Sequence, residues 1–283
     1  MAKIMKGAEV TAALNEELKK RVAALADKKV TPTLAVLRVG EREDDISYEK
    51  GVLKRCDGIG VTVKRFLLPA DVSQDKLLEV IEEINQDQTI HGCLIFRPLP
   101  KHLDDQAVRQ ALKPEKDVDG ITDGSLAGVF TGSGEGFPPC TAQACIEILD
   151  HFQIPLKGKR VTVIGRSLVV GKPLAMMLLA RHATITVCHT RTVDMADRCR
   201  EAEIICAAAG VANMVTKDFL SSGQVVIDVG INFTPEGKLV GDVDFAAAEA
   251  IVDAITPVPG GVGTVTTSVL AKHVIMAAER TLA

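Results

Sequence analysis

The segment VTVIGRSLVVGKP (residues 161–173) decides the fold. It has the pattern of a buried strand that ends at Gly165, followed by a helix that opens near Gly171. Backbone N–H groups at such a helix start, together with the positive end of the helix dipole, bind pyrophosphate. The glycines follow G-x-S-x-x-x-G and not G-x-G-x-x-G, so this motif alone leaves open a glycine-rich turn without a ligand.

The same order of strand, glycine-rich turn and helix continues after this segment. Apolar runs predict strands, and amphipathic or capped runs predict helices. Beyond residue 141 we expect helices at 142–151, 171–181 and 264–282, and strands at 160–165, 184–188, 203–210 and 224–230. The glycines after these strands would lie at one edge of a parallel sheet, where a dinucleotide binds. PVPGG (257–261) is equally well explained as a rigid turn.

The same alternation fills the first half of the chain. We expect helices at 9–27 and 47–58 and one capped by Ser73, with strands at 33–40, 61–68 and 92–96. The stretch KDVDGITDGSLAGVFTGSGEGFPPCT (116–141) is rich in Gly, Ser and Pro, which indicates a long connection between two domains. The chain is therefore predicted to be an α/β protein of two domains with mostly parallel sheets.

Composition excludes several classes of protein. The 283 residues are 47% hydrophobic and 25% charged, and carry a formal net charge of -4, so a nucleic-acid partner is not expected. No apolar run is long enough to cross a bilayer and the first residues do not resemble a signal peptide, so we expect a cytoplasmic protein without a membrane partner. The seven cysteines form no C-x-x-C pair and are expected to be buried thiols. The six histidines show no ligand spacing, so no metal is expected.

The strand ends also indicate which nicotinamide cofactor is bound. Arg166 follows the first strand of the second half, at a place where a ribose phosphate would lie. The next strand ends with Thr190 and Arg191 in place of the acidic residue that usually binds a free 2′-hydroxyl. A hydroxyl and guanidinium groups suit a 2′-phosphate, which favours NADP while leaving NAD possible.

Taken together, these segments resemble the methylenetetrahydrofolate dehydrogenase/cyclohydrolase family along nearly the whole chain. The matching blocks are VG (39–40) leading to Tyr48, PLP (98–100), PEKDVDG (114–120), PCT (139–141), GRSLVVGKP (165–173), CHTRT (188–192), IDVGIN (227–232), GDV (241–243) and ITPVPGGVG (255–263). The resemblance implies a catalytic α/β domain of residues 1–138 plus 264–283 and a Rossmann-like NAD(P)-binding domain of residues 139–263. It also implies tetrahydrofolate bound in the cleft between the domains, and a homodimer.

The resemblance further implies roles for individual residues. Asp119 would hydrogen-bond the pterin ring and Tyr48 would stand beside the reacting centre. The substrate pocket would be lined by Pro259, Gly260 and Gly261, and the cofactor would be bound by Thr141, Gly165, Arg166, Ser167, Thr190, Arg191, Ile231, Gly263 and Thr266. The alternatives are that Asp119 only caps its loop and that Tyr48 is a half-buried helix residue.

Two departures from the family pattern bear on its second activity, hydrolysis of the methenyl product. The family has a Lys four residues after the Tyr and a Gln in V-Q-L-P-L-P, where this chain has Val52 and Phe96. Lys50 and Lys54 are each two positions from Val52, about 200° around a helix and therefore on the opposite face. We therefore expect an NADP-dependent dehydrogenase with weak or absent cyclohydrolase activity. The alternatives are a bifunctional enzyme that also makes 10-formyltetrahydrofolate, and a non-enzymatic folate- or nucleotide-binding protein.

Overall fold

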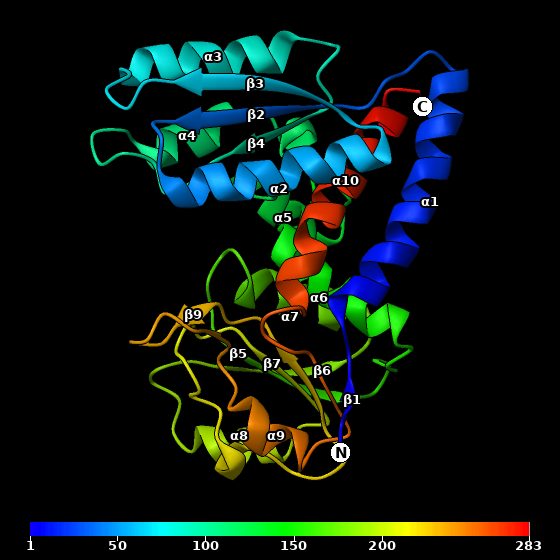
Figure 1. Ribbon diagram of the computed structural model, residues 1–283, viewed down its shortest axis with the longest axis vertical. Helices are drawn as coiled ribbons and strands as arrows, with labels where there is room; N and C mark the ends of the chain where they lie inside the picture. The colour runs from blue at the N-terminus through cyan, green and yellow to red at the C-terminus, as the bar shows by residue number, and fades with distance from the viewer. Residues whose placement is uncertain (283) are drawn as a thin grey trace. The chain divides into compact units, whose positions relative to one another are not determined.

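The computed structural model describes residues 1–282, which divide into two compact units (Figure 1). The six-stranded unit comprises Met1–Ala12 and Thr141–Thr266, and the three-stranded unit comprises Ala13–Cys140 and the chain from Thr267 onward. This division differs from the expected one at the N-terminus, where residues 1–12 were expected with the first domain. The reason is that β1 (Lys3–Ile4) pairs in parallel with β11 (Ala254–Ile255), which adds the N-terminus to the larger sheet.

The sheet of the six-stranded unit is parallel throughout. Its order is β1, β11, β8 (Val225–Asp228), β7 (Ile204–Ala207), β5 (Arg160–Ile164) and β6 (Thr184–Cys188). Its helices are α6 (Cys140–His151), α7 (Gly171–Ala180), α8 (Met195–Arg200) and α9 (Phe245–Glu249), with a 3-10 turn at Lys217–Phe219 and a hairpin of β9 (Asn232–Phe233) and β10 (Leu239–Val240). The chain leaves β5 to one side for β6 and returns to the other side for β7. This is a topological switch point, where ligands bind in open α/β sheets.

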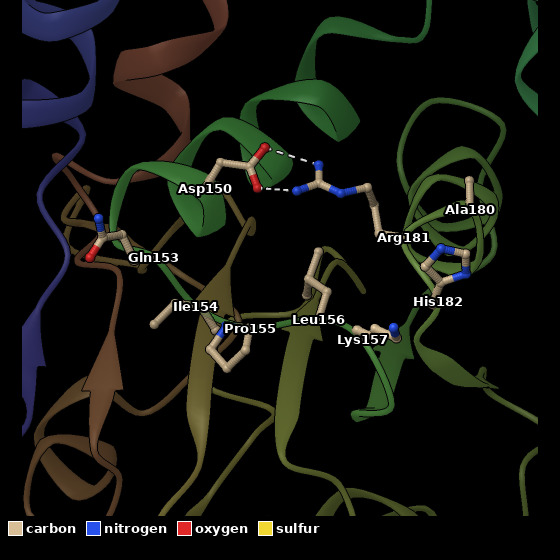
Figure 2. A pocket seen from close by; sticks show the side chains of 9 residues that line it. All are labelled: Asp150, Gln153, Ile154, Pro155, Leu156, Lys157, Ala180, Arg181 and His182. Atoms are coloured by element: carbon tan, nitrogen blue, oxygen red, sulfur yellow. Dashed lines mark hydrogen bonds and ion pairs between the residues drawn. The ribbon is translucent and has the colours of Figure 1, made fainter.

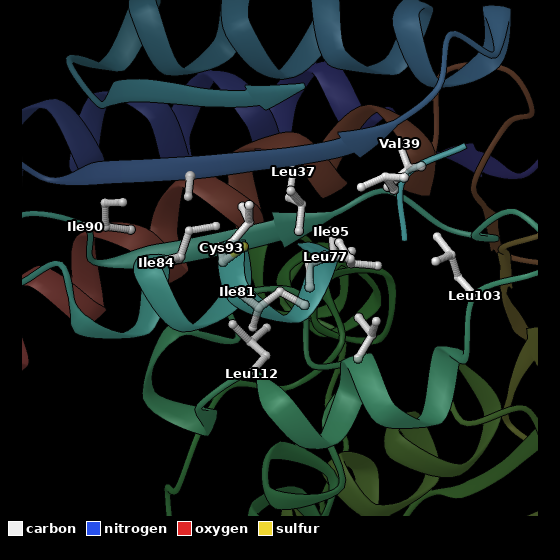
Figure 3. Packing of buried hydrophobic residues seen from close by; sticks show 14 residues of the cluster. Leu37, Val39, Leu77, Ile81, Ile84, Ile90, Cys93, Ile95, Leu103 and Leu112 are labelled. Carbon is white, nitrogen blue, oxygen red and sulfur yellow. The ribbon is translucent and has the colours of Figure 1, made fainter. Parts of the chain in front are cut away.

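The three-stranded unit has β2 (Thr33–Val39) between β3 (Thr62–Leu68) and β4 (Gly92–Ile95), again all parallel. Its helices are α1 (Gly7–Asp27), most of which lies in this unit, α2 (Glu43–Ile59), α3 (Gln74–Gln86), α4 (Asp105–Ala111), α5 (Asp123–Thr131) and most of α10 (Val262–Arg280), with a 3-10 turn at Pro114–Lys116. Figure 3 shows the core, in which Leu37 and Ile95 of the strands lie against Leu77 and Ile81 of α3. Every residue of β2 is buried, as expected for a central strand with both faces covered.

The α/β fold with parallel sheets is thus confirmed, and the expected strands and helices are found within a few residues of their predicted bounds. The main difference is α5, which lies inside the stretch predicted to be a connection. Its N-cap Thr122 accepts a hydrogen bond from the backbone N–H of Ser125, and Gly132 ends it in a left-handed conformation. All seven cysteines are unpaired and buried, as expected.

Candidate active site

Helix α2 carries Tyr48 and, about one turn later on the same face, Val52. Val52 is 1% exposed, whereas Tyr48 is 41% exposed. Lys50 and Lys54 are both exposed, so they lie on the other side of the helix from Val52, as the helical spacing predicts. Neither lysine side chain takes the place of a group at position 52.

Tyr48 lies against the residue that follows β4. Its ring meets that of Phe96 edge to face, with the ring centroids 6.0 Å apart and an interplanar angle of 76°. Phe96 itself is 7% exposed. The two positions at which the sequence departs from the family pattern are therefore both buried and apolar, and neither supplies a group that moves a proton.

Asp119 lies in the loop before α5, and its neighbour Asp117 performs the capping in that loop. The two carboxylate oxygens of Asp117 accept hydrogen bonds from the backbone N–H groups of Ile121, at 3.0 Å, and Thr122, at 2.7 Å. Asp117 is fully buried, whereas Asp119 is partly exposed as a residue. The structural role that the sequence left open for Asp119 thus belongs to Asp117.

The surroundings of Asp119 favour its protonated form. Burial, reinforced by the negative charge of Asp117, raises the pKa of Asp119 to about 7. A hydrogen bond from the thiol of Cys140 and the positive charge of Arg97 act in the opposite direction. A carboxyl group with this pKa changes its charge within the physiological pH range.

In the six-stranded unit, the turn after β5 has the form of a phosphate-binding loop. Gly165 has a φ of 123°, and a Cβ at this position would lie 2.2 Å from the carbonyl oxygen of Ala208, so only glycine fits. The side chains of Arg166 and Ser167 are exposed after it, and the Ser167 hydroxyl accepts a hydrogen bond from the N–H of Val170, at 3.1 Å, where α7 begins. A narrow turn that leads into a helix N-terminus, with a guanidinium beside it, fits a dinucleotide phosphate.

The neighbouring strand carries the other predicted cofactor residues. Strand β6 pairs with β5, and after it the chain makes a compact turn in which the N–H of Arg191 donates to Nδ1 of His189, at 3.1 Å. Thr190 and Arg191 are exposed on this turn. Arg166 and Arg191 thus follow the carboxyl ends of two adjacent parallel strands, β5 and β6. The turn 189–192 contains no acidic side chain.

Two buried aspartates, neither of which the sequence patterns revealed, hold the other loops at the carboxyl ends of these strands. Asp242 accepts hydrogen bonds from the backbone N–H groups of residues 209, 210 and 211 and from Nδ2 of Asn232. Asp228 accepts from the N–H groups of residues 230, 242 and 243. Burial raises the pKa of Asp228 to about 6, against these backbone hydrogen bonds. The glycine after Val240 is required here, because a Cβ on Gly241 would lie 1.8 Å from Oδ2 of Asp228.

The remaining predicted residues lie around this edge or next to it. Pro259, Gly260 and Gly261 follow β11, and the carbonyl of Gly260 accepts from the N–H of Gly7 at 2.8 Å. Ile231 is 63% exposed, and its Cδ1 lies 3.6 Å from where a Cβ on Gly263 would be. The Thr266 hydroxyl donates to the Gly263 carbonyl at 3.1 Å, and Thr141, in the first turn of α6, begins the second segment of the six-stranded unit. Tyr48 and Asp119 belong to the three-stranded unit, and all the other predicted residues belong to the six-stranded unit.

A separate depression lies at the other end of the strands of the large sheet, at their amino ends. Figure 2 shows it between the chain that leads from α6 into β5 and the end of α7, with the ion pair of Asp150 and Arg181 at its rim. These segments precede β5 and β6, so the depression is at the amino ends of the strands, away from the predicted cofactor residues. In residues 1–282 no group of His, Cys, Asp and Glu side chains is arranged to hold a metal ion, and no helix has the length and hydropathy to cross a membrane.

Curated relatives resemble the whole chain. It is 52% identical over 281 residues to the bifunctional protein FolD of Carboxydothermus hydrogenoformans, covering 99% of this chain and 98% of the relative. It is 49% identical to the bifunctional protein FolD of Clostridioides difficile, covering 98% of this chain and 96% of the relative.

Solved structures and family models agree with these relatives. The bifunctional FolD enzyme of Campylobacter jejuni superposes with a TM-score of 0.96 at 36% identity, covering 99% of this chain and all of that one. A Trypanosoma brucei dehydrogenase-cyclohydrolase, solved with NADP and an inhibitor, superposes with a TM-score of 0.92 at 34% identity, covering 99% and 98% of the two chains. Residues 5–119 match the catalytic-domain model of the tetrahydrofolate dehydrogenase/cyclohydrolase family, and residues 139–282 match its NAD(P)-binding-domain model. The chain therefore belongs to the tetrahydrofolate dehydrogenase/cyclohydrolase family.

Proposed function

We propose that this protein oxidises 5,10-methylenetetrahydrofolate to 5,10-methenyltetrahydrofolate by transferring a hydride to NADP. The observation that carries the proposal is the division of labour between two neighbouring aspartates. Asp117 caps its loop, whereas Asp119 is a partly exposed residue whose carboxyl group has a pKa raised to about 7. In its ionised form this group accepts two N–H donors from a pterin edge, which fixes orientation as well as affinity.

The chemistry asks little of the side chains beyond positioning. The bridging carbon of the substrate is flanked by two nitrogens, whose lone pairs take up the positive charge as the hydride leaves. NADP supplies the hydride acceptor. The protein has to hold the reacting carbon against the acceptor and exclude water, which is catalysis by proximity. Asp119 orients the pterin, and Tyr48, which is exposed on α2, covers the reacting centre.

The cofactor contacts belong to the six-stranded unit. The exposed Arg166 and Arg191, with the hydroxyl of Thr190, suit the 2′-phosphate of NADP. Gly165 and Ser167 hold the pyrophosphate at the start of α7. The proposal also places Thr141, Ile231, Gly263 and Thr266 on the cofactor and Pro259, Gly260 and Gly261 on the folate. The relative with bound NADP supports the choice of cofactor.

A second activity, hydrolysis of the methenyl product to 10-formyltetrahydrofolate, is the other candidate. The names of the curated relatives favour it over our expectation of weak hydrolysis, because they are called bifunctional. That expectation rests on Val52 and Phe96, which are buried and carry no ionisable group. Attack by water also requires proton transfer, to which a positioned group contributes about 10²–10⁴-fold.

One absorbance experiment separates the alternatives. The purified protein is mixed with methylenetetrahydrofolate and either NADP or NAD, and the reduced cofactor and the methenyl product are followed together. Reduction that is faster with NADP supports the proposal, and no reduction with either cofactor supports a non-enzymatic binder. Decay of the methenyl product faster than in buffer shows that the enzyme is bifunctional.

The proposal includes a homodimer. Two chains of 30.2 kDa predict a particle of about 60 kDa in light scattering after gel filtration. A particle with the mass of one chain would contradict this part of the proposal.

A further inference from the structure

A buried carboxylate one residue after Tyr48 is bound by arginines from two strands. Oε2 of Glu49 accepts from Nε of Arg38 at 2.8 Å, and Oε1 accepts from Nε of Arg65 at 2.6 Å. The side chains of Glu49 and Arg38 are 3% and 6% exposed, whereas that of Arg65 is 47% exposed. We call Glu49, Arg38 and Arg65 the Glu49 clamp.

The clamp connects α2 to the sheet beneath it. Arg38 lies in β2 and Arg65 in the paired strand β3. The guanidinium of Arg38 also donates to the carbonyl of Gly40, where β2 ends and the chain turns toward α2. One arginine therefore holds both the entry to the helix and a carboxylate in its second turn.

Stability alone gives a weak reason for this arrangement. Burying a carboxylate and a guanidinium is costly, and apolar residues of similar size often stabilise a protein as well or better. A charge pair with two directed hydrogen bonds fixes the relative orientation of the groups that it joins, and it does so more strictly than apolar packing. The clamp therefore points to a requirement for a fixed orientation of α2.

Tyr48 directly precedes Glu49 in α2. Successive helix residues point about 100° apart, so fixing the rotation of α2 at Glu49 fixes the direction of Tyr48. Phe96, which follows β4, restrains the Tyr48 ring from another side. From this geometry we infer that the Glu49 clamp is a positioning device for Tyr48 in hydride transfer.

Glu49 acts through Tyr48 and does not touch the substrate. Both of its carboxylate oxygens bind arginines, and its side chain is buried. The inference rests on the proposed function for the role of Tyr48 at the reacting centre. The orientation of Tyr48 is a property of the protein alone, so the two claims are tested separately.

The composition of the chain provides a direct measurement. Tyr48 is its one tyrosine and there is no tryptophan, so the emission of the protein without cofactor, excited at a wavelength that phenylalanine does not absorb, reports on this side chain alone. We compare emission anisotropy, kcat and KM for Glu49→Gln, Arg38→Met and Arg65→Met. The matched control is Lys64→Met, because Lys64 lies beside Arg65 in β3 but pairs with Asp87 and not with Glu49. Thermal melting shows which variants are folded.

The clamp predicts a coupled loss. Glu49→Gln lowers the anisotropy of Tyr48 and lowers kcat about tenfold or more, since misplacement by ~1 Å costs up to about 10²-fold. The KM for NADP stays within about twofold, because the substituted groups belong to the three-stranded unit and the cofactor residues to the six-stranded unit. Arg65→Met removes only the exposed arginine of the clamp and gives a smaller loss in the same direction. It replaces Glu49→Gln as the test if Glu49→Gln does not fold. Lys64→Met changes neither quantity.

A double variant distinguishes positioning from general stability. If Glu49 acts through the Tyr48 hydroxyl, Tyr48→Phe combined with Glu49→Gln is no slower than Tyr48→Phe alone. Additive losses, or unchanged anisotropy in Glu49→Gln and Arg65→Met, would overturn the inference. Reduced anisotropy with unchanged kcat would support the clamp while overturning the role that the proposed function gives to Tyr48.

Discussion

Tyr48 and Phe96 meet edge to face, with ring centroids 6.0 Å apart, and Phe96 occupies the position at which the family pattern has a glutamine. The companion position on α2 is Val52, which is 1% exposed. This side of the Tyr48 site is therefore lined by apolar groups. Such a surface tolerates hydride transfer, which needs alignment, but contributes nothing to the proton movements of hydrolysis.

Restoring polar groups at these two positions should therefore speed hydrolysis. We expect Val52→Lys with Phe96→Gln to hydrolyse added methenyltetrahydrofolate about tenfold faster or more than the unmodified protein, because a positioned proton-transfer group contributes about 10²–10⁴-fold. Val52→Lys alone should gain less, because the buried ammonium then lies near a phenyl ring without a polar partner. Val52→Met is the control for size. A double variant no faster than the unmodified protein would show that hydrolysis uses other groups.

Cofactor choice is predicted to depend on Arg166. Removing a charge-assisted hydrogen bond costs about 1.5–3 kcal/mol, so Arg166→Ala should weaken NADP binding roughly tenfold or more and change NAD binding little. The dissociation constants are measured by titration calorimetry with both cofactors. Arg160→Ala, at the opposite end of β5, is the control. An equal loss for NADP and NAD would place Arg166 on the shared pyrophosphate.

The activity should depend on pH through Asp119. Its pKa is raised to about 7, so the acid form, which has lost one acceptor, dominates below pH 7 and the carboxylate dominates above it. We therefore expect kcat/KM for the folate to rise with pH through about 7 and then to level off. Asp119→Asn should be much slower and lose this titration, while NADP binding survives. A wild-type profile without a step between pH 6 and 8 would contradict the assignment.

The aspartates beneath the loops of the six-stranded unit should be needed for stability and for cofactor binding. Asp228→Asn turns an amide N–H₂ toward backbone donors, which costs about 1–3 kcal/mol per unsatisfied group. We expect the melting temperature to fall by roughly 3–10 °C and NADP to bind more weakly. Asp218→Asn, at an exposed position, is the control. Unchanged melting and affinity in Asp228→Asn would show that the loops do not depend on this carboxylate.

Sequence patterns predicted the longer elements because their signals are local. Strands such as β2 and β5 are apolar runs followed by glycine, and α3 begins at a Ser73 cap that the structure confirms. Strand β1 has only two residues and is defined by pairing with β11, some 250 positions away, which no local pattern reveals. Helix α5 was not predicted because its glycines obscure the apolar periodicity of a helix. The structure gives a reason for one of them, since Gly128 packs so close to Glu135 that a Cβ would not fit.

The candidate site likewise contains residues that the sequence singled out and residues that only the fold reveals. Family blocks singled out Asp119, Tyr48 and the residues after β5 and β6 as candidates, but they did not show that the capping hydrogen bonds of the loop go to Asp117. The partners of Asp228 and Asp242 are backbone N–H groups, which are the same in every residue and leave no trace in the sequence. The Glu49 clamp joins three segments, and only the fold brings them together.

The central claim is that a hydride passes from the methylene carbon of the folate to NADP on this protein. The direct measurement uses methylenetetrahydrofolate with both methylene hydrogens replaced by deuterium and determines by NMR where the label goes. The account predicts one deuterium on C4 of the reduced nicotinamide and one retained on the methenyl carbon, only when the protein is present. Reduced cofactor without deuterium, or no reduced cofactor at all, would contradict it.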